Sequence, residues 1–453
     1  MNILFNNTYT IMIKKLLILT PFLAGLMFQS CSDDDFSGAN LNPVSVNAEV
    51  KFAGDFSDTK AINTNVLLKN TETGAEYKGV TDKDGKLVLP TVLPGKYTAT
   101  VTLTLTPKQF EAYFGYPSGN EEDIVFNGAA ENIAITSTNT TLSIELMAAK
   151  TVGGLVIKQI YYGGSHIKEG AVFRDQFVEI YNNSNEVMYA DGLIFAQLYG
   201  TTTTGTESYH TSTGQLDWSK GEGNTKGAAA NTDYVYADWV YRIPGSGIQY
   251  PIQPGKSITI AATAINHKAN YTDNSGNAVN ILNPDLTVDL SNADFEANFT
   301  SYTGSQYRWD IQNLNVPDLD ILFVYAGKEM TLDNLGRDAY VILNATAAEY
   351  NGFTKVKSPD PRPTSERYCI QIPNSFILDA VETTTDLANN LIPKKLNTSD
   401  DAGRTYLLQG AYTSTSVIRK TAKTINGRII LKDTNNSTED FVNIKANPKA
   451  FAN

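Results

Sequence analysis

The chain is poor in cysteine, histidine and basic residues, and each shortage excludes a class of protein. It has 2 cysteines and 3 histidines in 453 residues, too few for a disulfide framework or a histidine-rich metal site. It carries 36 basic and 48 acidic residues. The resulting charge of −12 disfavours nucleic acid and flat contact with anionic lipid. The sequence contains no GxGxxG, P-loop or GxSxG motif, so the common nucleotide and serine-hydrolase sites are not indicated.

Long apolar runs are also absent, except near the N-terminus. Lys14 and Lys15 precede the stretch Leu16 to Phe28, which holds no charged residue. The stretch is too short for a permanent membrane helix and is typical of the apolar core of a secretory signal peptide. It ends at Ser30 and Cys31. The chain is therefore expected to be exported.

A small residue and a cysteine directly after an apolar core resemble the cleavage site of bacterial lipoproteins. The resemblance implies a signal peptide over residues 1–30, a lipid on Cys31, and an acidic tether over 31–43. A conventional signal peptide with an unmodified thiol is the alternative. Met12 would be as natural a start as Met1, because lysines follow it closely. The next four residues resemble the signal that exports Bacteroidota lipoproteins to the outer face of the outer membrane; they are Ser32, Asp33, Asp34 and Asp35.

Residues 44–149 have the pattern of an antiparallel sandwich. Apolar and polar residues alternate from Val44 to Phe52 and from Tyr97 to Leu105, with turn signals at 82–85 and 94–95. The motifs at 81–87 and 93–98 are similar to the carboxypeptidase-regulatory, transthyretin-like module, a passive sandwich without catalytic residues. Residues 107–132 are interpreted as an added excursion.

Residues 150–453 resemble an enlarged lamin-tail domain, an immunoglobulin-like sandwich. The resemblance rests on Phe177–Asn183, Pro254–Ile260 and Gly427–Asp433. A lamin-tail domain is much shorter, so insertions are expected near 200–233, 269–316 and 350–365. The predicted fold class is all-β, a small sandwich followed by a larger one. The combination resembles an uncharacterised Bacteroidota surface lipoprotein family, which implies an architecture and a location but no established activity.

Few side chains offer catalytic or metal chemistry. His166, His210 and His267 lie tens of residues apart without metal-binding spacing. Residues 433–440 begin like a calcium loop, but Thr438 stands where such a loop needs glycine, so a strand-joining turn is expected. Cys369 is expected to be an apolar strand thiol. No catalytic residue, metal or cofactor is therefore predicted.

Two carboxylates were also considered as a catalytic pair. Glu179 and Asp191 flank the start of the lamin-tail-like region. Because Val178 and Ile180 are expected in the core, the Glu179 side chain should point to the opposite face and outward. We therefore interpret Glu179 as a framework residue.

Aromatic residues are plentiful, with 24 Tyr, 19 Phe and 3 Trp. Tyrosine and tryptophan on loops suit contacts with glycans, apolar ligands or protein partners. The alternative is that alternate aromatics cover a sandwich face. The candidate ligand surface consists of Tyr161, Tyr162, Tyr234, Tyr236 and Trp239.

These observations predict a non-catalytic, lipid-anchored outer-membrane protein that binds a ligand or acts as a scaffold. Its expected partners are an outer-membrane nutrient transporter and a glycan or peptide, without nucleic acid. One alternative is an extracellular polymer hydrolase whose site lies in the insertions. Another is a protein that handles nucleic acid beside a nuclease, which the acidic charge disfavours.

Overall fold

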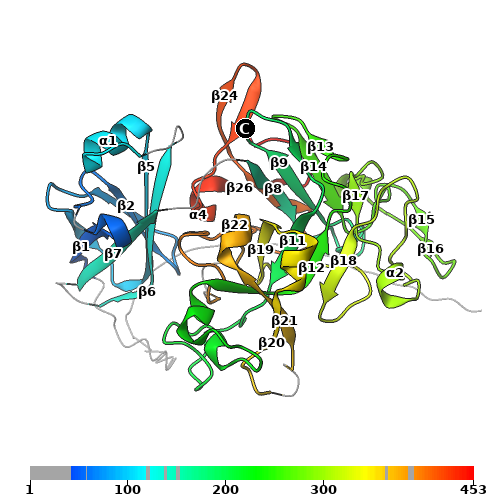
Figure 1. Cartoon of the computed structure of the whole chain (residues 1–453), viewed down its shortest axis with the longest axis horizontal. Coiled ribbons are helices and arrows are strands. Elements are labelled where there is room, and N and C mark those ends of the chain that lie inside the picture. The colour runs from blue at the N-terminus through cyan, green and yellow to red at the C-terminus, as the bar shows by residue number, and fades with distance from the viewer. Residues whose placement is uncertain are drawn as a thin grey trace, which may run out of the picture. The chain divides into compact units, whose positions relative to one another are not determined.

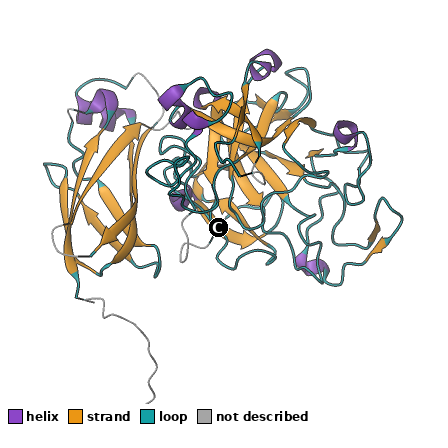
Figure 2. Ribbon diagram, turned by 90° about the horizontal axis from the view of Figure 1, so that it is seen from below, coloured by secondary structure: helices purple, strands orange, loops and turns teal. Residues whose placement is uncertain are grey.

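The computed structural model describes residues 42–57, 59–118, 123–136, 140–148, 154–362, 366–385 and 392–452. The predicted signal peptide, Cys31, Ser32 to Asp35 and nearly all of the tether lie outside these residues. Residues 42–453 form one compact unit. Figures 1 and 2 show a nearly all-β chain, as the sequence predicts.

The first part of the chain is a seven-stranded sheet that folds around an apolar core (Figure 1). Its spatial order is β3-β2-β5-β6-β7-β1-β4, with β1 parallel to β7 and every other pair antiparallel. The strands are β1 (Val44–Phe52), β2 (Asn65–Asn70), β3 (Glu76–Val80), β4 (Lys86–Val92), β5 (Gly95–Leu105), β6 (Ile124–Ile135) and β7 (Thr140–Ala148).

Residue size explains how the two terminal strands of this sheet meet. A Cβ on Gly79 of β3 would lie 2.4 Å from a methyl group of Leu87 on β4, so a larger residue there would require the Leu87 side chain to move. The alternating residues predicted from 44–52 and 97–105 point inward: Val46, Val50, Tyr97 and Val101 are fully buried. The predicted sandwich of this region is confirmed.

The interpretation of 107–132 as an excursion is half wrong. Helix α1 (Pro107–Phe114) does leave the sheet, and Thr106 caps its N-terminus in a capping box with Gln109. Residues 124–132, however, belong to β6, which pairs with β5 along ten positions. Strand β6 is hidden in the sequence because Gly128, Ala129 and Ala130 interrupt the alternation.

The rest of the chain contains two main sheets, of seven and six strands, that pack face to face. The first, called the β12 sheet, has the order β20-β21-β12-β11-β19-β22, with β18 also paired to β12. Its strands are β11 (Leu193–Leu198), β12 (Tyr234–Arg242), β18 (Asp320–Val324), β19 (Ala339–Asn344), β20 (Thr354–Lys357), β21 (Tyr368–Pro373) and β22 (Ile377–Glu382).

The second, called the β9 sheet, has the order β17-β14-β9-β8-β23-β26. Its strands are β8 (Leu155–Tyr161), β9 (Phe177–Asn182), β14 (Ser257–Ala261), β17 (Phe295–Glu296), β23 (Thr415–Arg419) and β26 (Phe441–Lys445). Side chains from both sheets, among them Ile157, Val178, Tyr241 and Ile342, share one apolar core. The predicted larger sandwich is therefore confirmed as a two-sheet structure.

Short elements complete the chain. Three two-stranded ribbons are β10 (Met188–Tyr189) with β13 (Pro251–Ile252), β15 (Tyr271–Thr272) with β16 (Ala278–Val279), and β24 (Thr421–Ile425) with β25 (Arg428–Leu431). The α-helices are α2 (Thr300–Thr303), α3 (Ala347–Asn351) and α4 (Ser437–Asp440). The 3₁₀ turns are η1 (Gly54–Phe56), η2 (Trp218–Lys220), η3 (Gly227–Asn231), η4 (Pro284–Leu286) and η6 (Asn374–Phe376). No described helix is long and apolar enough to cross a membrane.

The segments 200–233 and 269–316 contain little regular structure. Residues 200–233 hold turns, 3₁₀ helices and one isolated bridge between His210 and Leu216, and residues 269–316 hold two-residue strands, η4 and α2. Within 350–365, however, Thr354–Lys357 forms β20. Strand β20 occupies the edge of the β12 sheet. The prolines of this segment are predicted to exclude a central strand, and the first of them, Pro359, lies two residues after β20 ends.

Candidate functional site

Three of the five aromatic residues proposed as a ligand surface are buried. Tyr161, Tyr162 and Tyr236 expose 0%, 1% and 3% of their surface, so the prediction that they form an exposed surface is wrong. Tyr161 packs beneath residues of the 269–316 insertion, such as Val288, because this insertion folds back onto the outer face of β8. A strand pattern does not reveal such covering.

The remaining two residues are partly exposed and belong to different side-chain clusters along β12. Trp239 packs toward the core shared by the two sheets, with its ring 6.0 Å from that of Phe299. Tyr234 faces the same way as Tyr236 and lines a small cavity with it. The structure therefore brings together Tyr234 and Tyr236, and it separates both from Trp239.

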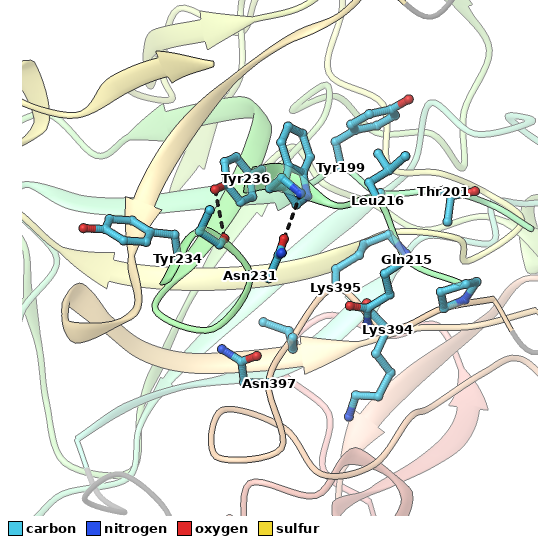
Figure 3. A pocket seen from close by; sticks show the side chains of 15 residues that line it. Tyr199, Thr201, Gln215, Leu216, Asn231, Tyr234, Tyr236, Lys394, Lys395 and Asn397 are labelled. Carbon is cyan, nitrogen blue, oxygen red and sulfur yellow. Dashed lines mark hydrogen bonds between the residues drawn. The ribbon is translucent and has the colours of Figure 1, made fainter. Parts of the chain in front are cut away.

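This cavity, called the aromatic pocket, forms where the 200–233 insertion crosses β12 and meets residues 393–397 (Figure 3). Its volume is about 30 Å³, enough for one small polar group rather than a whole ligand. The described residues that line it carry no carboxylate. Its functional side chains are Tyr199, Thr201, Gln215, Trp218, Asn231, Tyr234, Tyr236, Lys395 and Asn397.

Stacked rings form the rigid wall of the aromatic pocket. The rings of Trp218 and Tyr236 are parallel within 5° and 3.7 Å apart, and Tyr199 meets Trp218 edge-on at 6.3 Å. Asn231 accepts a hydrogen bond of 2.8 Å from the Trp218 backbone N–H, drawn in Figure 3. These contacts hold the insertion against β12, so the pocket is formed before any ligand arrives.

The Tyr236 hydroxyl is fully used inside the protein. It donates to the Ala230 carbonyl at 2.9 Å and accepts from the side-chain amides of Asn224 and Gln371, each at 2.9 Å. Burial raises the pKa of Tyr236 to about 12, although the hydrogen bonds from the side-chain amides of Gln371 and Asn224 act to lower it. Tyr236 is thus a neutral structural donor rather than an acid or base.

Lys395 is the unusual group of the aromatic pocket. Its side chain is 3% exposed, and its Nζ has no hydrogen-bond acceptor among the described residues. The Glu382 carboxylate lies 3.7 Å away and accepts from the backbone N–H groups of Lys395 and Leu396. A buried ammonium with unused donors is costly unless an acceptor reaches it. The carboxylates of Glu382, Asp238 and Asp338 act on this charge, so the unused donors of Lys395, rather than an unpaired charge, are its unusual feature.

An ion pair lies on the same face of the β12 sheet. Arg367 Nη1 is 2.7 Å from Asp238 Oδ2, and its guanidinium lies 4.3 Å from the Tyr199 ring and 4.2 Å from the Tyr325 ring. Burial raises the pKa of Asp238 to about 6, against the lowering effect of Arg367. Both members are occupied by each other and by aromatic rings, which indicates a structural role.

Cys369, as the sequence predicts, is a buried strand thiol. It lies in β21 and is 0% exposed. Burial and the neighbouring Asp238 raise its pKa well above the ordinary value. A thiol in this state is a poor nucleophile.

The three histidines serve separate local roles. His166 accepts from the backbone N–H of Glu169, and His210 pairs with Glu207 at 3.0 Å. His267 is fully buried, bonds the Thr263 carbonyl and has a pKa lowered by burial to about 4. In the described ranges, no group of three or more His, Cys, Asp or Glu side chains is arranged to hold a metal ion.

The calcium-like stretch 433–440 joins β25 to β26, as predicted, and consists of a turn followed by the short helix α4. A guanidinium contacts its acidic residues: Arg419 Nη1 lies 2.9 Å from Asp433 and 3.2 Å from Asp440. The Asp440 carboxylate also accepts from the backbone N–H of Thr434 at 2.8 Å. The acidic pattern is therefore matched by an internal cation.

Neither of the two carboxylates considered earlier is available for catalysis. Glu179 is 0% exposed, so the prediction that it points to solvent is wrong. Lys449 donates its backbone N–H to Glu179, because the C-terminal segment covers that face of β9. Asp191 accepts from backbone N–H groups of residues 246–250, which lower its pKa and fix a turn.

Sequence reasoning missed Trp218, Gln215 and Lys395. One signal was available: Trp218 is a large apolar residue inside an otherwise polar, aperiodic insertion. Such a residue usually anchors its loop to the body of the protein. Which strand it would contact cannot be deduced from a strand pattern.

Comparison with known proteins gives a family of unknown function. Residues 253–448 match the family described as "Protein of unknown function (DUF4876)". The chain is also similar to the crystal structure of a DUF4876 family protein from Bacteroides thetaiotaomicron, with 26% identity and a TM-score of 0.51. That alignment covers 88% of this chain and 95% of the other. These findings support similarity to an uncharacterised Bacteroides family, as the sequence predicts.

Other comparisons add little. A DUF3823 family protein from Bacteroides ovatus is 12% identical over 48% of this chain and 98% of its own, but its TM-score of 0.15 carries no argument. A search of curated proteins gave no match. The resemblances to the carboxypeptidase-regulatory and lamin-tail domains stay predictions.

Proposed function

We propose that this protein is a non-catalytic surface lipoprotein that binds a glycan or peptide and assists an outer-membrane nutrient transporter. The observation that carries the binding role is Lys395, which lines the aromatic pocket and whose buried ammonium has no acceptor within hydrogen-bond distance among the described residues. The location rests on the leader, with its apolar core, Cys31 and the acidic residues that follow.

The pocket suits one polar group at the end of a ligand. A hydroxyl or carbonyl oxygen can accept from Lys395 after a small shift of the lining, while the partly exposed Tyr234 ring packs beside the neighbouring atoms. The absence of a carboxylate among the described lining residues supports binding without hydrolysis, since glycosidases use two such groups.

Two variants test the pocket. Purified protein is applied to arrays of neutral glycans and peptides, and hits are measured by calorimetry. Tyr234→Ala and Lys395→Met should each weaken binding about tenfold, which corresponds to roughly 1.4 kcal/mol. Tyr189→Ala is the control, because Tyr189 is 42% exposed and does not line the pocket. The pocket assignment is wrong if every hit binds both variants as well as the original protein.

The proposed location has its own test. Mass spectrometry of protein purified from native membranes should find an N-terminal, lipid-modified Cys31, and protease added to whole cells should cleave the protein. Pull-down from solubilised membranes should recover a transporter. An intact leader on the purified protein would reject the anchor, and full protection from protease would reject surface exposure.

A further inference from the structure

A second cavity lies at the base of the ribbon formed by β24 and β25. The ribbon projects from the body of the molecule (Figure 1). Its cavity, called the hairpin pocket, has a volume of about 470 Å³, within the range of small-molecule sites. It shares no residue with the aromatic pocket. The two sites can therefore be tested independently.

Positive charge is concentrated at this ribbon. Residues 419–432 contain five basic residues and no acidic residue, in a chain whose net charge is −12. Lys423, Arg428 and Lys432 line the hairpin pocket. A cationic cavity on an acidic protein selects small anions, because the surrounding charge repels long polyanions.

Arg428 is held ready for an anion. Its Nη1 donates to the carbonyls of Asn183 at 2.8 Å and Ser184 at 2.7 Å. Its stem fits over Gly255, where a Cβ would lie 2.9 Å from the Arg428 Cγ. Among the described residues Arg428 has no carboxylate partner, so its Nε–Nη2 edge stays available. That edge matches the two oxygens of a carboxylate or sulfate.

The two lysines add charge to different degrees. Lys423 is exposed and has no ion-pair partner in the described ranges. Lys432 is already shared with Glu439, whose backbone and side-chain oxygens each lie 3.1 Å from its Nζ. Of the two acids at the pocket, Asp433 is bound by Arg419 at 2.9 Å and Asp123 is exposed. Among the described lining residues, the positive charges of Arg428 and Lys423 therefore outweigh the single exposed carboxylate of Asp123.

The other lining residues indicate a ligand rich in hydroxyl groups. Thr104 and Asn185 provide a hydroxyl and an amide beside the cationic side chains, whereas the hydroxyls of Ser184 and Thr434 already donate to groups of the protein. Such groups both donate to and accept from sugar hydroxyls. We infer that the hairpin pocket binds one acidic sugar unit, whose carboxylate or sulfate contacts Arg428 and Lys423.

The test is calorimetry on the full purified chain with trigalacturonate, galactose 6-sulfate and neutral galactotriose. The acidic sugars should bind and galactotriose should not, and higher salt should weaken the binding. The two acidic probes tell whether a carboxylate or a sulfate is preferred. Single-stranded DNA and vesicles of equal parts phosphatidylglycerol and phosphatidylcholine serve as competing partners, and neither should bind.

Variants locate the binding. Lys423→Gln and Arg428→Lys should each lower the affinity for the acidic sugar about tenfold, because the first removes a charge and the second the bidentate edge. Lys168→Gln removes an exposed charge that does not line the pocket and should change nothing. If Arg428→Lys loosens the fold, Lys423→Gln still decides, since Lys423 is exposed.

Several results would overturn the inference. They are absence of acidic-sugar binding, equal binding of galactotriose, unchanged affinity in Lys423→Gln, or preference for DNA or vesicles. Tyr234→Ala should leave acidic-sugar binding intact. Failure at the hairpin pocket is therefore distinguishable from failure at the aromatic pocket.

Discussion

Arg419 and Asp379 join the two sheets of the larger sandwich through a buried, two-pronged ion pair. Arg419 Nη2, on β23, donates to both carboxylate oxygens of Asp379, on β22, at 3.0 and 2.7 Å. Ile157 on β8 completes the link, because its N–H donates to Asp379 and its carbonyl accepts from Arg419 Nε. One cation thus connects strands that face each other across the core.

Replacing this cation should destabilise the protein strongly. Arg419→Met leaves the carboxylates of Asp379, Asp433 and Asp440 without their shared partner. We expect a loss of about 3–5 kcal/mol in the free energy of unfolding, measured by urea denaturation. Arg242→Met breaks an ion pair with the partly exposed Asp320 and should cost below about 1 kcal/mol. Equal losses in the two variants would contradict the assigned role.

Stability should fall as the pH rises from about 6.5 to about 8. Burial raises the pKa values of Asp175, Glu296 and Asp310 to about 7, above their unfolded values of about 4. The folded form therefore keeps protons that the unfolded form has released. This stabilisation is complete at low pH and is lost as pH rises through 7. This pH window avoids the titration of His267. Its pKa in the folded protein is about 4, so its contribution to stability changes with pH only in more acidic solutions.

Urea denaturation at several pH values checks this trend. Asp310→Asn and Glu296→Gln should flatten the decline, because each removes one titrating group. The backbone bonds that Asp310 accepts from Phe299 and Glu296 accepts from Ala264 remain possible in the amides. A free energy of unfolding that rises across the same window would disprove the assignment of these groups.

The sequence predicts a strand well where one face of the strand is buried and the other is exposed to solvent. The alternation from Tyr97 to Leu105 matches β5 because only its inward residues contact the core. Strand β6 is not predicted by this alternation. A Cβ on Gly128 would lie 2.6 Å from the Glu145 carbonyl, so close packing requires glycine there. In the sequence, this glycine resembles a loop residue. Strand β9 is buried on both faces and shows no polar side.

The candidate site was less predictable, because it depends on where the insertions fold. Tyr234 and Tyr236 share a face by strand periodicity, and that part was available from the sequence. Their partner Trp218 comes from a loop without periodicity, and Lys395 follows strand β22 by many residues. Only tertiary packing brings these groups together. The same packing buries Tyr161 and Tyr162, which the sequence suggested were exposed.

Cys369 should stay unreactive while the protein is folded. Its thiol is buried, and burial raises its pKa, so both access and thiolate formation are suppressed. We expect Ellman's reagent to detect no Cys369 thiol in native buffer and one in denaturant, with Cys31 replaced by serine to remove the other thiol. Rapid labelling without denaturant would show that β21 opens readily.

Lys158 and Glu179 form a second buried ion pair, and its energetics can be separated by paired substitutions. The Lys158 Nζ lies 2.9 Å from Glu179 Oε1, with side chains 1% and 0% exposed. Burial lowers the pKa of Lys158, while Glu179 acts to raise it. Glu179→Gln leaves the ammonium buried without a counter-charge, which should cost about 3–5 kcal/mol. The double variant Lys158→Met with Glu179→Gln leaves no isolated charge, so urea denaturation should show a smaller loss than in Glu179→Gln alone. A double variant less stable than either single one would mean that the pair itself, rather than charge balance, stabilises β8 and β9.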